Sequence, residues 1–243
     1  MRTQPASFAT LTAIAVTAYL VADTAHEALG HGGACLLSGG RSLLVDTTFQ
    51  DCSIRSRWID GAGPASGILV ALLAWMAARQ TVDRNLRVFL ALVFAYAAFW
   101  NFGYLVKSGI GYTGDWHFLI EGLEPAAVWH FGIAAAGVVL YIAAMRILAS
   151  LWPAGEGTSS LVFAVTAYLA AAALSAAAGY FDPRGPRTIL TDALPASLAA
   201  FGLVLTGLRA KSGVAIAPST PWTIAGLAGA AIFVAILGPG LPF

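Results

Sequence analysis

Long apolar runs alternate with short polar stretches along the whole chain of 243 residues. A run of about 20 mostly apolar residues forms a helix long enough to cross the hydrocarbon core of a bilayer. The runs predict seven such helices, over residues 8–30, 62–79, 86–107, 127–149, 159–180, 188–208 and 222–238. Between the first two, residues 41–58 read as a short extended, β-like excursion, and Thr113–Glu124 reads as an interfacial turn or re-entrant piece.

Small residues are frequent within the predicted helices, for example the Ala-Ala-Ala-Gly run at 134–137. No hydrophobic force drives helices together in lipid, so small residues, which let backbones approach closely, favour their association. We therefore expect an all-α polytopic membrane protein in which residues 1–243 form a single transmembrane domain, one helical bundle.

The composition supports this class, because 58% of the residues are hydrophobic and only 10% are charged. A soluble globular domain carries roughly 25% charged residues. The chain is therefore not an ordinary soluble enzyme, and its expected partner is the lipid bilayer. Its net charge of +1 gives no reason to expect a nucleic-acid partner.

Lysine and arginine are nearly balanced between the two sides of the predicted bundle. The short turn at 79–87 holds three arginines, and short basic loops favour the cytoplasmic side. This indicates a multi-pass protein of a bacterial-type plasma membrane with a cytoplasmic N-terminus. Cys35 and Cys52 then lie on the oxidising side, where a disulfide and two buried free thiols are both open alternatives.

Four ionisable side chains lie close together at the end of the first predicted helix: Asp23, His26, Glu27 and His31. Ionisable groups within a membrane span are costly, and by default they mark a functional site. Imidazoles next to carboxylates are the groups that bind metals and transfer protons. This segment is the most informative feature of the sequence.

The two histidines are five residues apart, which places them about 140° from each other around a regular α-helix. A π-bulge near Ala28–Gly30 would add one residue to the turn and could bring His26 and His31 together. A regular helix would instead present Asp23, Glu27 and His31 as one stripe. The spacing alone leaves both geometries open.

Three segments carry a resemblance to a known family. The His-Glu-Ala-Leu-Gly-His segment at 26–31 is followed by the Gly-Ala-Gly-Pro-Ala-Ser-Gly segment at 61–67, and then by Asn101 and the Gly-Asp-Trp segment at 114–116. In order and rough spacing they resemble the site-2 protease family of intramembrane zinc metalloproteases. That family carries a His-Glu-x-Gly-His type motif, so this chain has one residue inserted, and the resemblance favours the bulge.

The resemblance implies a metalloprotease-like core over residues 8–124, with additional helices over 125–243. It implies that His26, His31 and Asp115 bind Zn²⁺ and that Glu27 transfers the proton of a zinc-activated water. It also implies that Asn101 hydrogen-bonds the substrate backbone or the oxyanion. The third element departs from the family's Leu-Asp-Gly-Gly pattern, so Asp23 and His117 stay possible alternative ligands.

The expected function is a membrane-embedded zinc-dependent hydrolase, most simply a peptidase that cleaves a membrane-protein or peptide substrate within or near the bilayer. Three alternatives remain: a zinc amidase acting on lipid, a proton or cation relay or transporter, and an inactive protease-like scaffold. The proline-rich segment at 182–187 is interpreted as a stiff connector between two spans.

Overall fold

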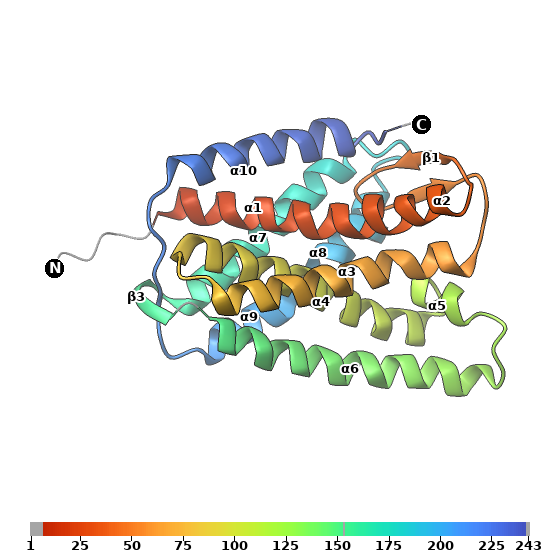
Figure 1. The fold of residues 1–243 in the computed structure, drawn as a ribbon, viewed down its shortest axis with the longest axis horizontal. Helices are drawn as coiled ribbons and strands as arrows, with labels where there is room; N and C mark the ends of the chain where they lie inside the picture. Colours follow the sequence, from red (N-terminus) through yellow and green to blue (C-terminus); the bar gives the residue numbers. More distant parts are fainter. Residues whose placement is uncertain (1–6, 153, 242–243) are drawn as a thin grey trace.

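The computed structural model describes residues 7–152 and 154–241, and most of them lie in long helices (Figure 1). Seven helical segments of this part are long and apolar enough to cross a membrane, which confirms the seven predicted spans. They cover Phe8–Leu37, Arg57–Gln80, Arg84–Gly111, Ala126–Leu151, Ser160–Gly179, Ile189–Arg209 and Thr220–Leu237. The chain is therefore an all-α, multi-pass integral membrane protein.

Four spans are single α-helices: α3 (Arg57–Gln80), α4 (Arg84–Gly111), α6 (Ala126–Leu151) and α7 (Ser160–Gly179). The first span joins α1 (Phe8–Thr24) through the π-helix η1 (Ala25–Gly32) to α2 (Gly33–Leu37). The sixth consists of η2 (Ile189–Ala193), α8 (Leu194–Leu198), η3 (Ala199–Phe201) and α9 (Gly202–Arg209), and the seventh of α10 (Thr220–Ile232) and η4 (Phe233–Leu237).

Helix α4 lies at the centre of the bundle, and every residue from 91 to 101 is buried. Helices α1, α3 and α6 pack around it, while α10 packs on the outer side of α1 (Figure 1). A hydrogen bond also joins α4 to α7: the Tyr96 hydroxyl donates to the carbonyl of Ala167 at 2.8 Å. The resulting bundle packs α1 directly against α4.

The second span begins earlier than predicted, at Arg57 rather than at residue 62. Its N-cap is Ser56, whose side chain accepts a hydrogen bond from the backbone of Ile59 at 3.3 Å, and such a cap satisfies one of the free N–H groups at a helix start. Pro64 therefore lies inside α3 and does not open it. A proline there removes one hydrogen bond of the helix.

The β-like excursion expected between the first two spans is a two-stranded antiparallel hairpin, β1 (Ser42–Val45) and β2 (Gln50–Cys52). Of the two alternatives left open for the cysteines, Cys35 and Cys52 form a disulfide, with their Cα atoms 5.9 Å apart. On its other edge, β1 pairs with Leu241 near the C-terminus. A further short strand, β3 (Ala154–Thr158), contacts Val214.

The hairpin, the short helix α5 (Asp115–Ile120) and the C-terminal segment lie together at one end of the bundle, opposite the N-terminus (Figure 1). Helix α5 has only six residues, so the Thr113–Glu124 segment does not cross the membrane and forms a turn, as expected. The ionisable residues of the first span lie at this same end.

Candidate metal centre

The π-helix η1 brings the two histidines of the first span together. Hydrogen bonds of the i→i+5 type widen its turns, so that residues five apart face the same side. The Nε2 atoms of His26 and His31 are consequently 3.3 Å apart. The wide turn expected near Ala28–Gly30 is confirmed, and it extends over Ala25–Gly32.

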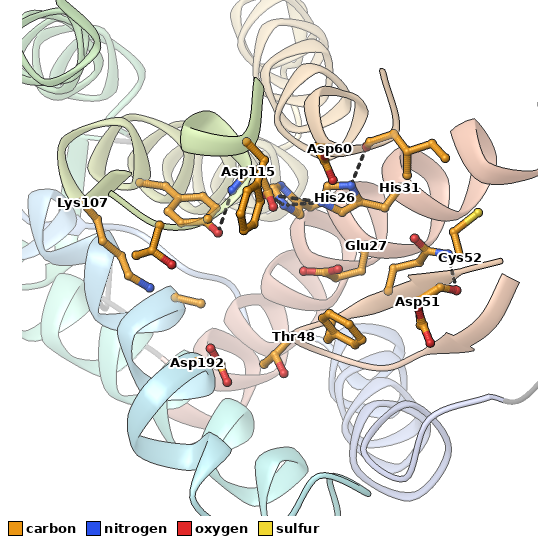
Figure 2. Close-up of a pocket in the computed structure, with 18 of the residues that line it drawn as sticks. His26, Glu27, His31, Thr48, Asp51, Cys52, Asp60, Lys107, Asp115 and Asp192 are labelled. Carbon is orange, nitrogen blue, oxygen red and sulfur yellow. Dashed lines mark hydrogen bonds and ion pairs between the residues drawn. The ribbon is translucent and has the colours of Figure 1, made fainter. Parts of the chain in front are cut away.

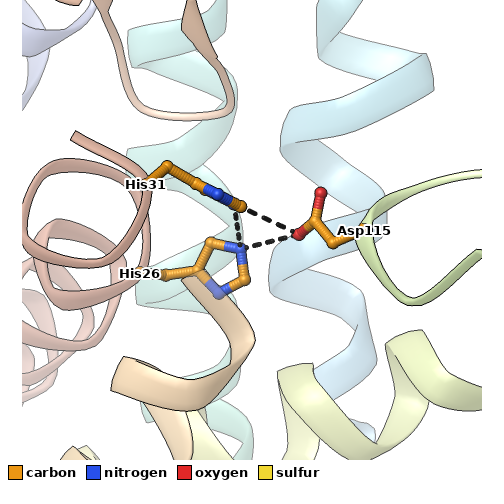
Figure 3. Close-up of side chains that lie close together, drawn as sticks. All are labelled: His26, His31 and Asp115. Carbon is orange, nitrogen blue, oxygen red and sulfur yellow. Dashed lines mark hydrogen bonds and ion pairs between the residues drawn. The ribbon is translucent and has the colours of Figure 1, made fainter. Parts of the chain in front are cut away.

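Asp115 comes from the start of α5 and completes a triangle with the two histidines (Figure 3). Its Oδ2 atom lies 3.1 Å from Nε2 of His26 and 3.3 Å from Nε2 of His31. Burial favours the neutral carboxylic acid, but hydrogen bonds with the two histidines outweigh it and hold the pKa of Asp115 below its usual range. The carboxylate is therefore the form present at neutral pH.

These three atoms fit a metal ion of tetrahedral preference. With bonds of about 2.0–2.1 Å, two ligands of a tetrahedral zinc site are about 3.3 Å apart. The three separations in this structure, 3.1, 3.3 and 3.3 Å, match that value. Two imidazoles and one carboxylate are also a donor set of catalytic zinc sites, which keep the fourth position open. The group of His26, His31 and Asp115 could thus hold a metal ion.

Neighbouring groups fix the orientation of each histidine. Nδ1 of His31 lies 2.7 Å from the carbonyl oxygen of Ile59, which leaves Nε2 free to bind a metal when Nδ1 carries the proton. The ring of His26 stacks on Trp100, with ring centroids 4.5 Å apart and planes 20° from parallel. Both histidines are less than a tenth exposed. The surrounding protein therefore holds the two histidine rings in place.

Two glycines make room for this arrangement. A Cβ atom at Gly63 of α3 would lie 2.2 Å from Nε2 of His31, so only glycine allows α3 to pass so close. Gly114, just before α5, has a φ of 83°, a region that side chains rarely adopt. The next residue, Asp115, donates its backbone N–H to the hydroxyl of Tyr104 at 3.2 Å, which anchors the third ligand.

The triangle faces a cavity of about 820 Å³ at the same end of the bundle. Figure 2 shows the carboxylate of Glu27 pointing into this cavity beside the ligand triangle. Asp60 also lines the cavity near the ligands, while Lys107 and Asp192 lie farther from them. Charged and polar side chains therefore share the lining of this space with apolar ones such as Trp100 and Phe118.

We compared the chain with known proteins. No family model, curated protein or solved structure matches it. A functional proposal for this chain therefore has to be argued from the geometry of the centre.

The other predicted site residues lie outside the triangle. Asn101 is fully buried, donates to the carbonyl of Ala97 at 2.9 Å and does not line the cavity. Asp23 is 1% exposed on α1, outside the cavity lining. His117 does not line the cavity either, and its ring packs 5.2 Å from that of His130 on α6. The structure thus groups Asp115, and neither Asp23 nor His117, with the two histidines.

Sequence reasoning missed several residues that support or line the centre: Trp100, Tyr104, Asp60 and Arg184. Asp60 gave a signal, since it is an acidic residue directly before the Gly-Ala-Gly-Pro segment of the second span. The aromatic pair gave none, because aromatic residues are common in membrane helices and their contacts depend on how α4 packs.

Proposed function

We propose that this chain is a membrane-embedded, zinc-dependent hydrolase, a peptidase that cleaves membrane-protein or peptide substrates within or near the bilayer. One observation carries the proposal: the tetrahedral spacing of His26, His31 and Asp115 beside the Glu27 carboxylate in one cavity. A metal bound by three protein ligands, with a carboxylate next to it, is the arrangement of hydrolytic zinc enzymes.

Bound at these three ligands, zinc would supply a Lewis acid and lower the pKa of a water toward neutrality. Glu27 directly follows the first ligand in sequence and is 5% exposed, with its side chain facing the cavity. Its carboxylate accepts the proton of the attacking water and gives it to the leaving amine. His31 and Asp115 stay in place during this transfer because Ile59 and Tyr104 hold them.

The wide turn bears on the alternative of an inactive scaffold. The inserted residue of the motif was the reason to consider lost activity, but η1 absorbs it and the ligand atoms still converge. The size of the cavity favours a hydrolase over a relay, because a proton relay needs no space of this size. A zinc amidase acting on lipid would use the same ligands, and the substrate assay below distinguishes it.

The centre belongs, in our proposal, to the oxidising side of a bacterial-type plasma membrane, with the N-terminus in the cytoplasm. The disulfide between Cys35 and Cys52 lies at the same end as the metal centre, and disulfides persist in oxidising compartments. The opposite end carries the short arginine-rich turn that joins α3 to α4. A membrane-impermeant maleimide added to intact cells should label Thr113→Cys and spare Val82→Cys; the reverse pattern would refute this orientation.

Metal analysis of the purified protein tests the zinc assignment. We expect one zinc per chain in the wild type and loss of zinc in His26→Ala, His31→Ala and Asp115→Ala. His117→Ala is the matched control, because His117 lies on α5 only two residues from Asp115 and should leave zinc unchanged. Zinc retained in Asp115→Ala, or lost in His117→Ala, would contradict the ligand assignment.

Turnover is tested in proteoliposomes with fluorescein-labelled casein and, separately, with a fluorescent ceramide. We expect cleavage of casein by the wild type, and Glu27→Gln should keep its zinc and lose cleavage by a factor of about 100 or more. Hydrolysis of the ceramide without cleavage of casein would replace the peptidase by a lipid amidase. No turnover with zinc bound would contradict the proposed hydrolase.

A further inference from the structure

The segment at 182–187, which the sequence presents as a mere connector, contacts the hairpin that walls the cavity. Nη2 of Arg184 donates to Oγ1 of Thr48 and to Oδ2 of Asp182, each at 2.7 Å. The same nitrogen lies 3.5 Å from Oδ2 of Asp46. The guanidinium also covers the ring of Phe49, 4.6 Å from its centroid. One side chain thus contacts three residues of the hairpin turn, Asp46, Thr48 and Phe49.

The two carboxylates of this cluster need that cation. Asp46 is 2% and Asp182 is 6% exposed, so neither is well solvated. Both contact the guanidinium of Arg184, at 3.5 and 2.7 Å. The Arg184 side chain is itself 32% exposed, but removing it leaves two buried carboxylates without their cation, which is destabilising. Without Arg184, the two carboxylates would repel each other and separate the hairpin from the 182–187 segment.

The hairpin is held at two further places. The backbones of Val45 and Leu241 exchange two hydrogen bonds, of 3.1 and 2.9 Å, along the outer edge of β1. On the other side, the disulfide joins Cys52 of β2 to Cys35, four residues after the ligand His31. Two of the three attachments, those made by Arg184 and Leu241, therefore come from residues 125–243. This part of the chain lies outside the metalloprotease-like core expected over residues 8–124.

Residues 48–52 line the cavity, and Figure 2 shows Thr48 across the cavity from the ligand Asp115. The position of the hairpin thus sets how far that wall stands from the metal centre. We propose that Arg184 is a positioning residue, which locks the turn at 46–49 to the 182–187 segment and so fixes the cavity wall against which the substrate binds. The effect of Arg184 on substrate binding rests on the proposed hydrolase function.

Hydrogen–deuterium exchange of the full-length protein in detergent measures the lock directly. In Arg184→Gln, exchange of the amides at 45–52 should rise by about tenfold, the factor for loss of a charge-assisted hydrogen bond. Arg187→Gln is the matched control, since Arg187 lies in the same segment, is exposed and makes no side-chain hydrogen bond or ion pair with the described residues. Unchanged exchange at 45–52 in Arg184→Gln would overturn the proposal.

A milder variant covers the case in which Arg184→Gln does not fold. Thr48→Val removes the three hydrogen bonds of the Thr48 hydroxyl, with Arg184, Asp46 and Asp182, and keeps both ion pairs of Arg184. Its exchange at 45–52 should therefore rise less than in Arg184→Gln but still exceed that of Arg187→Gln. If the amides at 45–52 exchange equally fast in Thr48→Val and Arg187→Gln, the proposed attachment of the hairpin turn to the 182–187 segment is wrong.

The catalytic consequence is read from zinc content and from kinetics on labelled casein. Arg184→Gln should keep one zinc per chain and raise KM more than it lowers kcat, because it moves a binding wall and no ligand. A wild type without zinc or turnover would defeat the proposed function and leave the exchange result intact. Loss of zinc in Arg184→Gln would contradict the proposal that Arg184 positions the cavity wall and not the metal ligands.

Discussion

Gly63→Ala offers the sharpest test of the ligand geometry, because the three atoms nearest to the added methyl group all belong to His31. The new Cβ would lie 2.2, 2.5 and 2.6 Å from the Nε2, Cε1 and Cδ2 atoms of His31. Non-bonded heavy atoms settle at about 3.5 Å, so the ring has to move by roughly 1.3 Å. Metal–ligand distances tolerate only about 0.2 Å. The third corner of the triangle is therefore lost.

Mutating a residue that orients a metal ligand typically lowers the metal affinity by about 10- to 100-fold. Displacement of a ligand itself should exceed this range, so we expect the zinc affinity of Gly63→Ala to fall by about 100-fold or more. Competition of the purified protein with a chromogenic zinc chelator measures the affinity. Gly33→Ala is the matched control, since it lies in the same span as His31 and its Cβ would meet no atom within 4 Å.

Making Gly63→Ala in a His31→Ala variant separates displacement of His31 from destabilisation of α3 as a whole. In His31→Ala, the atoms that the new methyl group would meet are gone. Adding Gly63→Ala to that background should then change thermal stability far less than Gly63→Ala does in the wild type. Wild-type zinc affinity in Gly63→Ala, or an equal loss of stability in both backgrounds, would refute the placement of His31.

Three further predictions follow from the wide turn, the buried carboxylates and the disulfide. Deleting Leu29, which is 69% exposed, leaves the two histidines four apart on a regular helix; the deletion should keep zinc bound, while an extra alanine inserted after Leu29 should abolish binding in the same metal analysis. Burial raises the pKa of Asp46 from 3.8 to about 6, although hydrogen bonds from Thr48 and the charge of Arg184 oppose this shift. The contribution of Asp46 to stability is therefore lost as pH rises from about 4 to 6. The pKa of Asp182 is lowered, because hydrogen bonds from Arg184 outweigh its burial, and its contribution is lost as pH falls. Thermal unfolding at pH 8 should therefore show Asp182→Asn to be less stable than Asp46→Asn, with the gap narrowing at pH 5; a gap independent of pH would contradict this. Removing the disulfide by Cys52→Ser should cost about 3 kcal/mol, as for other loops of this length, and a reductant should lower the unfolding temperature of the wild type but not of the variant.

The sequence could predict what depends on neighbours along the chain. Apolar runs located all seven spans, since a helix in lipid must satisfy its own backbone. The five-residue spacing of His26 and His31 pointed to a wide turn, which η1 provides. The resemblance supplied Asp115, which the structure brings to within 3.3 Å of both histidines.

What the sequence could not predict depends on contacts between distant segments. Trp100 stacks on His26, and Arg184 reaches Thr48, across 74 and 136 residues of chain. Neither pair carries a local pattern, because each contact depends on how α4 and the loop after α7 pack. The resemblance predicted a role in the reaction for Asn101, and that role stays a prediction. The structure adds only that its side chain is buried beside Gly67.

The wide turn of η1 also bears on how such centres arise and how they escape notice. One extra residue in a regular helix rotates everything after it by about 100°, away from its former partners. Here the wide turns stay within Ala25–Gly32, and α2 continues the helix to Cys35 of the disulfide. A helix can thus gain a residue between two ligands and keep both. Searches that require two histidines at one fixed separation will pass over proteins built in this way, although their ligand atoms meet at ordinary metal-binding distances.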